Sequence, residues 1–90
     1  MIETALELLK LDLQITSSAY DGYLEHLIES AIDFIRVEGI ALGSDVGDIQ
    51  LVVMYAAYLF RKRTDEKGAG MPRMLRYALN NKLFAQKAGE

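Results

Sequence analysis

The sequence predicts an all-α fold, a small bundle of about four helices, and three observations support this. Apolar residues recur three and four positions apart in four segments, and no segment shows the sustained alternation of a β-strand. Breaks rich in glycine or serine separate the segments at residues 16–18, 39–47 and 68–70. The length of 90 residues is that of one domain, so we expect a single domain over residues 1–90.

The first predicted helix is short. Its apolar residues lie on two adjoining edges, at Leu6, Leu9 and Leu13 and at Leu8 and Leu11. An isolated helix shorter than ~12–15 residues is marginal in water. We therefore expect residues 3–13 to be helical only because they pack against the rest of the chain.

The second predicted helix covers residues 19–38. Ser18 is the predicted N-cap, Asp21 adds a negative charge to the first turn, and Gly39 is the predicted residue beyond the C-terminus. Five apolar residues share one face at helical spacing, which predicts that this face is buried. They are Leu24, Leu27, Ile28, Ala31 and Ile35.

The third predicted helix covers residues 46–64, with Ser44 or Asp45 as its cap, and is apolar on two faces. One face carries Ile49, Val52, Val53, Ala56, Leu59 and Phe60, and the other carries Leu51, Tyr55 and Tyr58. A bundle of this size has little left to cover the second face, so we expect that face to contact a partner. The cations that end the helix suit its negative C-terminus.

A polar, glycine-rich loop is predicted at about 64–71, and we expect it to be mobile. Pro72 is the predicted first residue of a fourth helix. Its core-facing residues are predicted from their spacing to be Met71, Met74, Leu75, Ala78, Leu79 and Leu83. We expect the tail at about 85–90 to be frayed.

Charge is divided unevenly along the chain, although the net charge is only −3. Residues 1–60 contain two basic and ten acidic side chains, whereas residues 61–90 contain eight basic and three acidic ones. Contacts between unlike surfaces of identical subunits generate rings or filaments. The division of charge is therefore suited to assembly from copies of this chain.

Two charged sets are candidates for a partner interface. Four acids stand four positions apart on the second helix, either as a solvated face or as a docking surface for the cations of another subunit: Asp21, Glu25, Glu29 and Asp33. The basic set could contact phosphate, complement the acids of a neighbour, or be a solvated helix end: Arg61, Lys62, Arg63, Lys67, Arg73 and Arg76.

No motif for catalysis, a cofactor or a metal is present, so we predict that the chain is not an enzyme. It has no phosphate-binding glycine loop and no nucleophile paired with a base. His26 is the only histidine and lacks a second ligand at metal-binding spacing, and the absence of cysteine excludes thiolate sites. The apolar stretch 49–60 is too short to cross a bilayer, and no signal peptide is evident, so we expect no membrane contact.

Four stretches together resemble a known family over nearly the whole chain. They are Leu8–Ile15, the acidic Tyr23–Ile35, the apolar helix that ends in Tyr58–Arg63, and Met71–Tyr77. In this order they resemble the small head–tail connector proteins, also called adaptor or head-completion proteins, of long-tailed phages and prophages. Thr16 stands where the leading motif of that family usually has an acid.

The resemblance implies a structural protein of the virion, found at the head–tail junction and in the host cytoplasm during assembly. About a dozen copies would form a ring under the portal protein, and a stopper or tail-completion protein would dock below. DNA would pass through the ring, with possible non-specific contact, and the family has neither enzymatic activity nor a cofactor.

We expect the second and third helices, with basic residues of the C-terminal third, to form the oligomer or partner interface. The residues predicted to contribute are Asp21, Glu25, Glu29, Asp33, Leu51, Tyr55, Tyr58, Arg61, Lys62, Arg63, Arg73 and Arg76. The alternative is a small helical nucleic-acid-binding module that uses the basic C-terminal third. The net acidic charge and the lack of a recognition helix rich in Arg, Asn and Gln argue against it.

Overall fold

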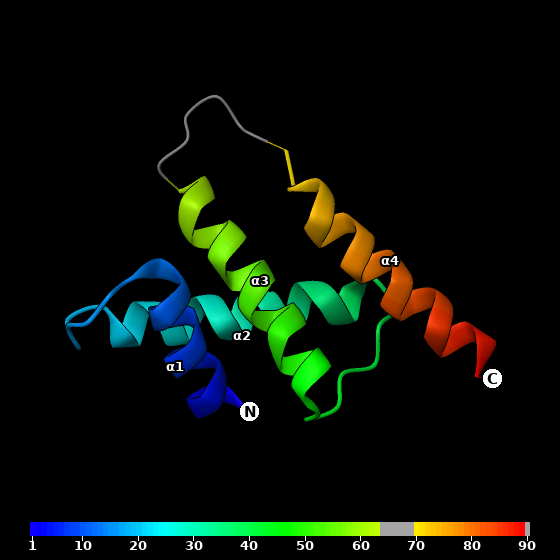
Figure 1. The fold of residues 1–90 in the computed structure, drawn as a ribbon, viewed down its shortest axis with the longest axis horizontal. Helices are drawn as coiled ribbons and strands as arrows, with labels where there is room; N and C mark the ends of the chain where they lie inside the picture. The colour runs from blue at the N-terminus through cyan, green and yellow to red at the C-terminus, as the bar shows by residue number, and fades with distance from the viewer. Residues whose placement is uncertain (64–69, 90) are drawn as a thin grey trace.

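The computed structural model describes residues 1–63 and 70–89, which form four helices joined by short connections (Figure 1). The helices are α1 (Ile2–Leu13), α2 (Asp21–Val37), α3 (Val46–Lys62) and α4 (Arg73–Ala88). The all-α prediction is confirmed. The predicted loop at 64–71 lies outside the described residues except for its last two positions, as does Thr64, the predicted end of the third helix.

Helix α3 occupies the centre of the bundle. It packs against α1, α2 and α4, whereas α4 packs mainly against α3. Figure 1 shows α2 crossing behind the other helices, with α1 and α4 on opposite sides of α3. The molecule is flat, with extents of 43 × 31 × 18 Å.

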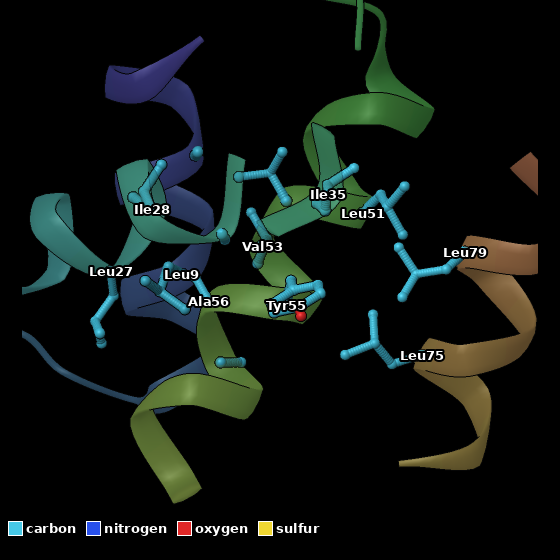
Figure 2. Packing of buried hydrophobic residues seen from close by; sticks show 14 of the residues in the cluster. Leu9, Leu27, Ile28, Ile35, Leu51, Val53, Tyr55, Ala56, Leu75 and Leu79 are labelled. Carbon is cyan, nitrogen blue, oxygen red and sulfur yellow. The ribbon is translucent and has the colours of Figure 1, made fainter. Parts of the chain in front are cut away.

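The core joins the inner faces of all four helices (Figure 2). All five residues predicted to face inward from α2 are buried, as are Ala5 and Leu9 of α1. Leu24, Ile28 and Ile35 are fully excluded from solvent. Burial of one such side chain stabilises the fold by roughly 1.5–3 kcal/mol, which explains why the short α1 is helical here.

Among the predicted ends of α2 and α3, the Asp45 cap and Gly39 are confirmed and Ser18 is wrong. The Asp45 side chain accepts a hydrogen bond of 2.8 Å from Asp48 N–H at the start of α3. Gly39 follows α2 with φ of 92° and donates its N–H to the Arg36 carbonyl. Ser18 is not the N-cap of α2, because Tyr20 holds that position and the Ser18 carbonyl accepts the Asp21 N–H in the preceding turn.

Helix α4 differs from its prediction at both ends. Pro72 is the N-cap, not the first helical residue, because its ψ of 140° is extended. The tail predicted to be frayed continues the helix to Ala88. The physical reason is Gln86, whose side chain accepts the Ala41 N–H at 2.7 Å and donates to the Gly39 carbonyl at 2.9 Å.

The second apolar face of α3 is not open to a partner, which corrects the prediction for Leu51 and Tyr55. Leu75 and Leu79 point from α4 towards these two side chains (Figure 2). As a result Tyr55 is only 8% exposed, and Leu51 is buried. The chain therefore covers this face with its own fourth helix, and Tyr58, at the end of the face, stays partly exposed.

Candidate assembly interface

The acidic set of α2 is divided by the fold. Glu25, Glu29 and Asp33 are exposed and make no ion pair with another described residue. Asp21 instead lies against α1, where Lys10 Nζ is 2.8 Å from its Oδ1 atom. This contact is an ion pair without hydrogen-bond alignment, because Asp21 Oδ1 accepts no hydrogen bond. Three of the four predicted acids thus remain available to another molecule.

Two basic residues predicted to meet a partner have acidic neighbours in their own chain. Arg61 donates to Asp12 at 3.0 Å, and Arg76 donates to Glu38 at 2.7 Å. Both pairs are exposed, and such pairs contribute about 0–1 kcal/mol each. The first pair joins α3 to α1, and the second joins α4 to the end of α2. Both arginine side chains stay partly exposed to solvent.

Lys62, the last residue of α3, and the following Arg63 lie over aromatic rings. Lys62 Nζ is 5.7 Å from the centre of the Tyr58 ring, and the Arg63 guanidinium is 4.2 Å from that of Phe60. Arg63 also approaches Tyr23 of α2, at 5.5 Å. Cation–π contacts at exposed sites are worth about 0.5–1 kcal/mol. These two cations therefore stabilise the bundle end, and their predicted role in an interface stays a prediction.

An ion pair with a buried carboxylate and a partly exposed lysine holds the middle of α4 against the start of α3. Lys82 Nζ lies 2.7 Å from Asp48 Oδ1, and the Gly43 N–H donates to Asp48 Oδ2 at 2.6 Å. Burial acts to raise the pKa of Asp48, but the hydrogen bonds from Lys82 and Gly43 and the lysine charge outweigh it. The pKa of Asp48 is therefore below its ordinary value, and its hydrogen bond raises the pKa of Lys82.

A row of exposed apolar side chains runs along the outer face of α4. We call Met74, Tyr77 and Phe84 the α4 row; they are 75%, 61% and 69% exposed. At about 100° per residue the row lies nearly opposite Leu75 and Leu79, the two buried residues of α4. Met74 was predicted to face the core, and that prediction is wrong.

An apolar groove continues inward from the α4 row, between α3 and α4. Its volume is about 270 Å³, and its walls include Val53, Met54, Ala57 and Met74. Charged side chains of Asp12, Arg61 and Lys62 border it. Methionine adapts its shape to different partners, so these walls suit a contact surface.

A second exposed apolar feature lies on α1, across the molecule from α4. Leu11 is 75% exposed and Leu8 is partly exposed, and we call this pair the α1 edge. Glu3 and Glu7 precede Leu11 at intervals of four, so all three lie on one side of the helix. The α1 edge therefore combines apolar area with negative charge.

The candidate interface residues that sequence reasoning did not select are those of the α4 row and Met54. The signal was present, because Met74, Tyr77 and Phe84 follow the three- and seven-residue intervals of a helix face. A second set, Leu75, Leu79 and Leu83, follows helical spacing equally well. Choosing which set is buried requires the position of α4 on α3.

Comparisons of this chain with protein-family models, with curated proteins and with solved structures find no match. The resemblance to phage connectors therefore stays a prediction. Within residues 1–63 and 70–89, no three His, Cys, Asp or Glu side chains are grouped so as to hold a metal ion. None of the helices in these ranges has both the length and the hydropathy needed to cross a membrane.

Proposed function

We propose that this chain is a structural assembly subunit, a head–tail connector whose copies form a ring between a phage portal and the tail. The α4 row carries the proposal. Three large apolar side chains exposed on one helix face are not needed for the fold of a single copy, and such faces mark contact surfaces. The buried second face of α3, which sequence reasoning favoured, no longer supports it.

The division of charge also supports assembly. Helix α4 contains four cations and no acid from Arg73 to Ala88, while α1, on the other side of α3, contains three acids and one lysine. Unlike surfaces on opposite sides of a subunit favour head-to-tail contacts, which close into a ring when the rotation permits. About a dozen copies, a portal above and a stopper or tail-completion protein below are parts of this proposal.

The test combines the pure chain with the intact virus. We expect negative-stain electron microscopy and native mass spectrometry to find closed rings of about a dozen copies, alone or on the purified portal of the same genome. We also expect deletion of the gene to give filled heads and detached tails. Joined particles in the deletion lysate would contradict the proposal.

A further inference from the structure

We infer that the partner of the α4 row is the α1 edge of a second copy of this chain. Met74, Tyr77 and Phe84 of one copy would pack against Leu8 and Leu11 of the next. This inference rests on the proposed function, since it names the surfaces through which the ring would close. It differs from the predicted contact, which used α2 and α3.

The two surfaces match in size and chemistry. A helix rises about 1.5 Å per residue, so the 12 residues of α1 fit within the 16 residues of α4. Each surface presents large apolar side chains on one face of a helix. Two such faces bury each other by side-chain interdigitation, as helix pairs do in general.

The unpaired charges of the two helices are complementary. Lys10 and Asp12 of α1, and Arg76 and Lys82 of α4, already have partners in their own chain. The remaining charged side chains, Glu3 and Glu7 on α1 and Arg73 and Lys87 on α4, are exposed and make no ion pair among the described residues. Two unpaired acids would thus border an edge that meets two unpaired cations.

The acidic face of α2 is a weaker candidate for the same partner. Its acids follow one another at intervals of four from Asp21 to Asp33, and only Val37 continues that spacing as a large apolar side chain. An interface needs an apolar centre inside its polar rim. The α1 edge provides that centre beside its acids, whereas Phe34 and Val37, exposed apolar residues of α2, lie at the C-terminal end of the acidic row.

The positions of the helices make the contact heterologous. Because α1 and α4 lie on opposite sides of α3, one copy cannot join its own α1 edge to its own α4 row (Figure 1). Each copy would use both surfaces with two different neighbours. One helix pair buries less than the roughly 1,600 Å² of a standard interface, so a single contact is weak, and ring closure supplies the avidity.

Cysteine cross-linking tests the pairing directly, because the chain has no cysteine of its own. We would mix Leu11→Cys with Tyr77→Cys or with Phe84→Cys in equal amounts and add a short bismaleimide. We expect covalent dimers in at least one mixture and far fewer with any variant alone. The doubly substituted chain, Leu11→Cys with the reactive α4 position, should give a ladder of multiple copies.

Glu29→Cys mixed with the same α4 variants is the matched control, since Glu29 is an exposed acid on α2. Dimers from this mixture at the same yield, or no dimers from the Leu11→Cys mixtures, would overturn the inference. Rings without the Leu11 cross-link would contradict this pairing and leave the proposed function standing. If the cross-linked ladder forms but deletion of the gene leaves tails attached to heads, the pairing would stand and the proposed function would be contradicted.

Charge exchange provides a second readout. We expect Glu7→Lys to weaken self-association about fivefold, as an exposed ion pair allows, and Arg73→Glu with Lys87→Glu to do the same. Mixing the two variants should restore association, measured by sedimentation at low salt. If each variant assembles like the parent, or if the mixture shows no rescue, the charges do not face one another.

Discussion

Asp48 connects three parts of the chain through one buried carboxylate. Its two oxygens meet Lys82 of α4 and the Gly43 N–H, and its own N–H donates to the Asp45 cap. The carboxylate is nearly excluded from solvent, whereas Lys82 remains about one third exposed. A charge buried in this way must keep its partner or become neutral. The pair therefore links the stability of the α3–α4 contact to pH.

The Lys82→Met variant should deprive Asp48 of its cation and of that cation's hydrogen bond while leaving the Gly43 N–H in place. We expect a loss of about 2 kcal/mol in the free energy of unfolding at neutral pH, because Asp48 stays buried without its cation. The loss should shrink at acidic pH, because a buried carboxyl without its cation takes up a proton more readily. Urea unfolding at both pH values measures this, and an equal loss at both would contradict it.

In the parent, by contrast, the Asp48–Lys82 pair stabilises the fold less as the pH falls into the acidic range. The pKa of Asp48 is lowered by folding, so its stabilising contribution is present above the ordinary carboxyl pKa and declines as the pH falls through the folded value. The pKa of Lys82 is raised, so its contribution is present below the ordinary lysine pKa and declines as the pH rises through the folded value. For Lys82→Met the matched control is Lys87→Met, which removes a lysine that has no ion pair among the described residues.

Gly39 tests the role of backbone conformation after α2. Its φ of 92° is one that L side chains rarely adopt, although an added Cβ would only reach ordinary contact with Leu83 at 3.9 Å. We expect Gly39→Ala to cost about 1 kcal/mol from backbone strain alone. Gly22→Ala, in helix α2 with open space around it, should instead stabilise by about 0.5–1 kcal/mol. Equal shifts in thermal midpoint would contradict this account.

Helix α4 has two apolar faces, one buried against α3 and one exposed to solvent. Leu79 is fully buried against α3, whereas Tyr77, two positions away, is exposed. We expect Leu79→Ala to cost about 3 kcal/mol and Tyr77→Ala to change stability by less than about 0.5 kcal/mol. Urea unfolding of dilute protein measures both. A large loss from Tyr77→Ala would mean that the α4 row packs within the single chain.

Spacing predicted the helices well because each apolar face repeats within its own segment. The five inward residues of α2 and the Asp45 cap needed no knowledge of the other helices. The candidate interface was harder to predict. Whether Leu51 or Met74 meets solvent depends on where α4 lies, and the ion pairs that occupy Arg61 and Arg76 join residues 49 and 38 positions apart. Local periodicity carries no information about such distant pairs.

At the scale of the whole molecule, the fold weakens the case for DNA binding through the C-terminal third. Arg61, Arg76 and Lys82 each have an acidic neighbour in the chain, and the acids of α2 repel phosphate. We expect no measurable affinity for short duplex DNA at physiological ionic strength, as judged by fluorescence anisotropy. Tight binding that falls steeply with added salt would favour the nucleic-acid-binding alternative instead.

The acids of α1 and the cations of α4 lie on opposite sides of the flat bundle, so the molecule has an electric dipole moment although its net charge is small. A positively charged resin or microscope support would attract the α1 side, and a negatively charged one would attract α4. The same protein should therefore adsorb to both kinds of exchanger at low salt. On each it would settle in a different orientation, with the opposite side left facing the solution.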